Sequence, residues 1–165
     1  MTTFNLYPRG SEWRKWDLHI HTPYTKLDDK YIVFDNEDIW EKFCEIVEQS
    51  DVEVFGITDY FSVDNYFIFL KKFREKFPKS SKRFFPNIEF RLEDKNKEND
   101  HINIHVIFSN DLIEDDIQKF LDDTELENIS ENRSKLKCSK NDLEKIGYKK
   151  ALVTKNAIVE SLEKT

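Results

Sequence analysis

Segments typical of strands and of helices alternate through the first two thirds of the chain, which limits the folds that are open to it. Apolar runs rich in β-branched and aromatic residues predict strands at 15–22, 52–59, 84–93 and 102–109. Apolar residues at helical spacing predict helices at 36–50 and 64–77. Because strands that alternate with helices favour βαβ units, we expect an α/β protein with a mainly parallel sheet.

Each predicted helix has one apolar face. In 36–50 this face consists of Ile39, Trp40, Phe43, Ile46 and Val47, with Asp35 or Asn36 as the N-cap. In 64–77 it consists of Phe67, Leu70, Phe73 and Phe77. Further helices are expected at 110–123, beginning at Asn110 or Asp111, and at 140–146 and 154–164. We expect 94–100 to be an exposed turn, and the region 124–140 is polar and poorly periodic.

Composition indicates a folded, soluble domain. The chain of 165 residues is 38% hydrophobic and contains 14 phenylalanines, which is enough to form a core. Its net charge of −7 argues against a general nucleic-acid coat but leaves room for a local basic site. Cys44 and Cys138 form no CxxC pair, so we expect free thiols and a cytoplasmic location. No apolar run approaches about 18 residues, so we expect neither a membrane span nor a secretion signal.

About four strands can be recognised, whereas the commonest closed parallel barrel has about eight. We therefore expect either the opening part of a barrel or a smaller open sheet.

The first predicted strand, WDLHIH (16–21), carries two histidines two residues apart. Alternate residues on a strand share a face, so Asp17, His19 and His21 are expected to point the same way. Two imidazoles about 6–7 Å apart along a strand can converge on one metal ion or a close pair. The alternative is that both are core histidines that hydrogen-bond to their neighbours.

The three later strands each carry one acidic or imidazole side chain in an apolar setting. These residues are Asp59 in GITDY, Glu89 in PNIEF and His105 in INIHVIF. Strand ends carry the chemistry of α/β folds, and a buried carboxylate is costly unless it is paired or bound to a metal. The structural alternatives are a helix N-cap for Asp59, a solvated strand edge for Glu89 and a hydrogen-bonded core histidine for His105. The occurrence of these residues on successive strands favours a shared functional site over three separate structural roles.

The segments DLHIHT, GITDY, PNIEF and HINIHVIF, in this order, resemble the first motifs of the PHP domain (polymerase and histidinol phosphatase family). The resemblance covers residues 13–109 and implies the N-terminal portion of a distorted (βα)7 barrel with a two- or three-metal cluster. It implies that His19, His21, Glu89 and His105 are metal ligands and that Asp59 is a catalytic base or a further ligand. We expect one incomplete PHP-like domain over 1–165, with its metal motifs in 13–109 and a helical, polar segment at 110–165.

The stretches YPRGSEWRKWDLHIHTP and ITDYFSVDNY are similar to the start of bacterial TrlF-type proteins, in which a PHP domain precedes an SMC-like ATPase. This similarity implies a C-terminal ATPase region as a partner and a role in DNA processing or defence. The chain also departs from the family pattern. Tyr60 replaces a histidine, no histidine lies between Pro23 and Lys30, and none follows His105. The four histidines of the chain therefore cannot form a full three-metal cluster.

The resemblance implies hydrolysis of a phosphoester, with nucleic acid as one possible substrate class and Zn, Mn or Fe as the metal. Candidate substrate-binding residues are Tyr60, Arg74, Lys79 and Lys82, of which the last three belong to a basic segment at 71–83. The alternative for that segment is a solvated helix face. Because family ligands are missing, a degenerate PHP domain that serves as a structural or docking module is the second hypothesis.

Overall fold

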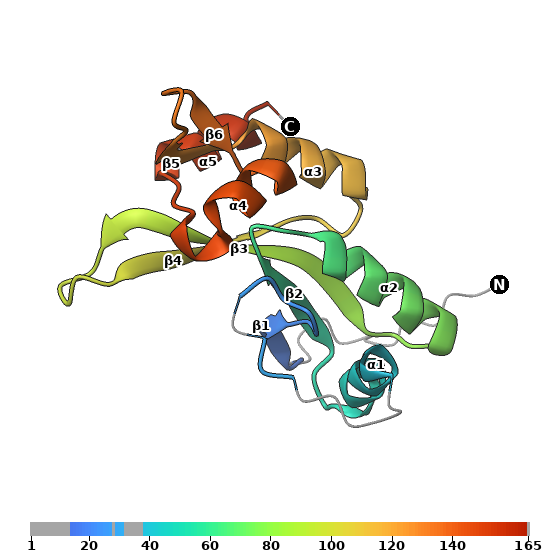
Figure 1. Ribbon diagram of the computed structural model, residues 1–165. Helices are drawn as coiled ribbons and strands as arrows, with labels where there is room; N and C mark the ends of the chain where they lie inside the picture. Colours follow the sequence, from blue (N-terminus) through green and yellow to red (C-terminus); the bar gives the residue numbers. More distant parts are fainter. Residues whose placement is uncertain (1–13, 28, 32–37, 165) are drawn as a thin grey trace.

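The computed structural model describes residues 14–27, 29–31 and 38–164 (Figure 1). Its centre is a curled sheet of four strands in the order β1-β2-β3-β4. These are β1 (Trp16–His21), β2 (Val54–Tyr60), β3 (Arg83–Lys95) and β4 (His101–Ile107). The first three strands are parallel, and β4 runs antiparallel to β3. The prediction of an α/β protein with a mostly parallel sheet is therefore confirmed.

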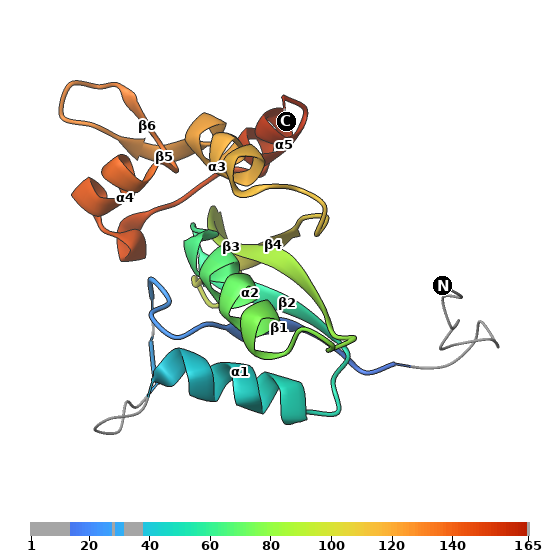
Figure 2. The ribbon, with the colours of Figure 1, turned by 90° about the vertical axis from the view of Figure 1, so that its right-hand side faces the viewer.

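Two helices, α1 (Ile39–Gln49) and α2 (Asp64–Lys76), connect the parallel strands and pack against each other (Figure 2). The N-cap of α1 is Asp38, whose carboxylate accepts a hydrogen bond from the backbone N–H of Trp40 at 2.9 Å. The predicted caps Asp35 and Asn36 lie outside the described residues. The predicted apolar face of α1 is right except for Ile46, which is 56% exposed. No described helix is long and apolar enough to cross a membrane.

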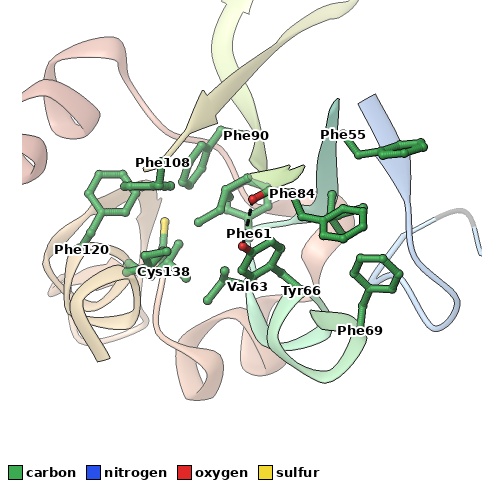
Figure 3. Packing of buried hydrophobic residues seen from close by; sticks show 14 of the residues in the cluster. Phe55, Phe61, Val63, Tyr66, Phe69, Phe84, Phe90, Phe108, Phe120 and Cys138 are labelled. Atoms are coloured by element: carbon green, nitrogen blue, oxygen red, sulfur yellow. Dashed lines mark hydrogen bonds between the residues drawn. The ribbon is translucent and has the colours of Figure 1, made fainter. Parts of the chain in front are cut away.

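A layer of phenylalanines joins these helices to the sheet (Figure 3). The ring of Phe84 in β3 lies 4.9 Å from that of Phe69 and 4.7 Å from that of Phe73, both in α2. Phe69 and Phe73 are fully buried, whereas Phe67 and Phe77 are only partly buried, so the inward face of α2 is rotated from the predicted one. Full burial of such a side chain stabilises the fold by roughly 1.5–3 kcal/mol.

Strand alternation gives the sheet two different faces. Phe55 and Ile57 of β2 and Ile88 of β3 belong to the hydrophobic core. Their sequence neighbours point to the opposite face, which is polar. Around the carboxyl end of β2, this face carries Thr58, Tyr60, Asn87 and Glu89. The candidate site is built on this polar face.

The last third of the chain packs against the same core. The remaining elements are α3 (Glu114–Asp123), β5 (Glu125–Ile129), β6 (Lys135–Lys137), α4 (Lys140–Ile146), the 3-10 helix η1 (Tyr148–Lys150) and α5 (Lys155–Leu162). Phe120 of α3 lies 6.0 Å from Phe90 and 5.1 Å from Phe108, measured between ring centroids. Both cysteines are buried free thiols, as predicted.

One prediction for this region was wrong. Helix α3 begins at Glu114 with Ile113 as its N-cap, not at Asn110 or Asp111. The polar, poorly periodic stretch at 124–140 contains the antiparallel pair β5–β6. These strands are short and polar on their outer sides, so their apolar residues Leu126 and Leu136 are too few to show a period in the sequence.

Candidate metal centre

The polar face of the sheet brings together three histidines and one glutamate from three strands. His19 and His21 lie at the end of β1, Glu89 lies within β3, and His105 of β4 pairs directly with Glu89 in the antiparallel register. Tyr60 at the end of β2 pairs with Glu89 on its other side. The four residues predicted to be metal ligands therefore converge.

The potential ligand atoms of this cluster are close to one another. The Nε2 atoms of His19 and His21 are 3.0 Å apart. The Oε2 atom of Glu89 lies 3.1 Å from Nε2 of His21 and 3.4 Å from Nε2 of His19. His19, Glu89 and His105 each offer one ligand atom within 4.8 Å of the others. Ligands bound tetrahedrally at about 2.0–2.1 Å are separated by roughly 3.3 Å, so the observed separations suit one metal ion.

Glu89 supplies the most specific sign of a cation site. Its side chain is 3% exposed, and its Oε1 accepts a hydrogen bond from Asn103 Nδ2 at 2.6 Å. Its Oε2 is buried and accepts no hydrogen bond from the described residues. Burial acts to raise the pKa of Glu89, but the neighbouring imidazoles and the hydrogen bond from the Asn103 amide hold it below its usual value. A buried, ionised oxygen without a donor is costly unless a cation neutralises it, so these residues fit a metal.

Asn87 holds His105 in a defined orientation. The amide nitrogen of Asn87 donates to the backbone oxygen of Leu18 at 2.7 Å and to Oγ1 of Thr58 at 2.9 Å. Its oxygen therefore faces Nδ1 of His105, 3.2 Å away, and must accept from it. The Nε2 atom of His105 is then unprotonated and available as a ligand. Burial and the neighbouring His19 lower the pKa of His105, which favours this neutral form.

An irregularity in β1 sets the position of His19. The register between β1 and β2 shifts between Asp17 and Ile20, so one extra residue is accommodated in β1. Asp17 does not join the cluster, and its carboxylate accepts from the backbone N–H of His19 at 3.2 Å. β1 is an edge strand of the described sheet, and Trp16 is 59% exposed.

Asp59 lies on the other face of the sheet from the cluster. Its parity in β2 matches that of Phe55 and Ile57, and it is 2% exposed. Its Oδ1 accepts from Thr25 Oγ1 at 2.7 Å and from the backbone N–H groups of Lys26 and Tyr60. Its Oδ2 accepts from Asn65 Nδ2 at 2.7 Å. The structure therefore gives Asp59 a full set of donors away from the ligand atoms and does not place it as a ligand or base.

A pocket of about 420 Å³ adjoins the cluster. It is lined by His19, His21, Thr25, Leu27, Lys30, Tyr31 and Tyr60. The ring of Tyr60 stacks on that of His21, with centroids 4.9 Å apart, so Tyr60 lies beside the cluster. Sequence reasoning did not predict Lys30 as a pocket residue, because Lys30 lies in a loop, where no periodic pattern indicates which way a side chain points. It also missed Asn87, although Asn87 and Glu89 are two apart in an apolar strand and must share a face.

The basic segment lies at the other end of the sheet. Lys82 immediately precedes β3, and Arg83 is its first residue. Glu89 lies six residues after Arg83, which corresponds to about 20 Å along the strand. Arg74 donates to the backbone oxygens of Ser80 and Lys82. Lys79 is exposed. None of the three lines the pocket beside the cluster.

Lys82 is a structural residue in this arrangement. It is 8% exposed, and its ammonium donates to the backbone oxygens of Ser50 and Val52. We expect Lys82→Met to lower the free energy of unfolding by about 2–3 kcal/mol, because two carbonyls lose a charged donor. Urea denaturation measures the effect, and the exposed Lys79→Met is the control, with an expected change near zero. Equal stability of the two variants would contradict this role.

No family model, curated protein or solved structure matches this chain.

Proposed function

We propose that this chain is a PHP-like, metal-dependent phosphoesterase domain, in which His19, His21, Glu89 and His105 hold a divalent metal ion. The observation that carries the proposal is the buried Oε2 of Glu89, which has no described donor and lies among imidazole nitrogens. Mixed imidazole and carboxylate ligands suit Zn, Mn or Fe. The curled, mostly parallel sheet with the cluster on its polar face supports the N-terminal portion of a PHP-type (βα)7 barrel, whereas the antiparallel β4 departs from the βα pattern.

A metal at this position would lower the pKa of a bound water to about 7 and stabilise charge on a phosphoryl oxygen. The residues of the chain supply the rest of the site. Asn103 orients Glu89, and Asn87 orients His105. Lys30 lines the adjoining pocket, where its ammonium can pair with a phosphoryl oxygen of the substrate. The ring of Tyr60 stacks on one face of His21 and restricts the orientation of that ring.

We propose a phosphodiester, such as that of a nucleic acid, as the substrate class, and an ATPase module C-terminal to this domain as the partner. The position of Lys79 and Lys82 gives no support to a nucleic-acid path through the basic segment. Substrate contact therefore rests on the pocket that contains Lys30 and Tyr60.

A non-catalytic docking role is the second candidate, and two observations favour it. Tyr60 occupies the position of a family histidine, and the carboxylate of Asp59 is fully engaged in hydrogen bonds. No other described carboxylate joins the cluster to act as a base.

The experiment that tests the proposal combines elemental analysis with hydrolysis of bis(p-nitrophenyl) phosphate. The wild type should bind about one equivalent of metal and hydrolyse the diester. We expect Glu89→Gln to reduce the metal affinity by more than the ~10–100-fold loss typical of residues outside the ligand shell. Glu93→Gln, an exposed acid on the same strand, should behave as wild type. Metal binding without hydrolysis would support the docking role. A wild type that binds no metal would contradict the proposed metal-dependent phosphoesterase and would also favour the docking role.

A further inference from the structure

Thr25 lies between the metal cluster and the buried carboxylate of Asp59. Its Oγ1 is 3.3 Å from Nδ1 of His21 and 2.7 Å from Oδ1 of Asp59. Thr25 is 7% exposed and follows β1 by four residues, in the loop that lines the pocket. One hydroxyl therefore joins a candidate ligand to a carboxylate on the opposite face of the sheet.

The direction of these two hydrogen bonds follows from the partners of Asp59. Among the described residues, every group that hydrogen-bonds to its carboxylate is a donor, namely Thr25, Asn65 and the backbone N–H groups of Lys26 and Tyr60. The hydroxyl hydrogen of Thr25 is therefore committed to Asp59. The only role left to its oxygen toward His21 is to accept, so Nδ1 of His21 carries the proton.

We propose that Thr25, held by Asp59, is a positioning residue that fixes His21 in its Nδ1-protonated tautomer and so presents the lone pair of Nε2 to the metal. This inference rests on the proposed function and deepens it, because it assigns a role to two residues that do not touch the metal. Metal-binding histidines characteristically donate their second ring nitrogen to a fixed acceptor, which sets the ring orientation. This role of Thr25 also explains why Asp59, whose carboxylate accepts hydrogen bonds at both oxygens, lies at the end of β2.

Three variants in one loop test this role. Thr25→Val keeps the shape of the side chain and removes the hydroxyl, whereas Thr25→Ser keeps the hydroxyl. Thr22→Val is the matched control, since Thr22 is also fully buried but its Oγ1 has no hydrogen-bond partner among the described residues. We expect Thr25→Val to weaken metal binding by about 10–100-fold, as is typical of outer-shell partners. Thr25→Ser should restore binding to within about threefold of wild type, and Thr22→Val should leave it unchanged.

The tautomer is measured directly by ¹⁵N NMR of the imidazole rings in metal-free protein at pH 8. The wild type should show His21 protonated at Nδ1, and Thr25→Val should show a mixture of tautomers. A wild-type His21 protonated at Nε2 would overturn the inference without any variant having to fold. An unchanged tautomer and unchanged metal affinity in Thr25→Val would overturn it equally. A wild type with the expected tautomer that binds no metal would contradict the proposed function and leave the assignment of Thr25 as the tautomer-fixing partner correct.

Discussion

His105→Ala is expected to remove most of the bound metal, whereas His101→Ala should leave the metal content near that of the wild type. His105 pairs with Glu89 across the β3–β4 register and is within ligand distance of the cluster. His101 pairs with Lys95 instead, and its Nδ1 lies 2.8 Å from the backbone oxygen of Leu92. Four residues along a strand correspond to about 13 Å, too far for both histidines to bind one ion.

A metal titration of both variants, with folding checked by circular dichroism, measures this difference. His105 is exposed, so its loss should change the stability of the metal-free protein little. We expect His105→Ala to lose both activity and bound metal and His101→Ala to retain both. The reverse pattern would show that the ligand set is wrong.

The sequence identifies His105 as a site residue, but the reason it suggests does not hold. The carboxyl ends of parallel strands are the usual catalytic edge, and His105 is near the carboxyl end of its strand. In the structure β4 is antiparallel, so its carboxyl end points the opposite way. The seven residues at 94–100 are too few for the helical crossover that a parallel strand needs, so the hairpin could have been predicted.

Asp59 shows a second limit of reasoning from single residues. It stands at the end of a strand, as a catalytic acid would, but its parity in β2 is that of Phe55 and Ile57. Counting from those two core residues would have placed it on the helix-covered face. The register shift in β1 is different, because it depends on a backbone contact between strands that no local pattern records.

Gly56→Ala is expected to disrupt the metal cluster, because a methyl group at this position of β2 would displace the backbone of β1. A Cβ on Gly56 would lie 2.3 Å from the oxygen and 2.8 Å from the carbonyl carbon of Leu18. Both are backbone atoms, so β1 itself would have to move. That movement would break the hydrogen bond from Asn87 to the oxygen of Leu18 and displace His19, the next residue. We expect a loss of about 3 kcal/mol in the free energy of unfolding, at the upper end for overpacking, together with at least a tenfold loss of metal affinity.

Gly147→Ala separates the loss of stability from the loss of the site. Gly147 has a φ of +81°, and a Cβ there would meet no atom within 4 Å. Its substitution should therefore cost about 1–2 kcal/mol through backbone strain alone and leave the metal affinity unchanged. Urea denaturation and metal titration on the two alanine variants give both quantities. If Gly56→Ala bound metal as tightly as Gly147→Ala, the close approach of Leu18 to β2 would not be what positions His19, and the irregularity in β1 would have no part in forming the site.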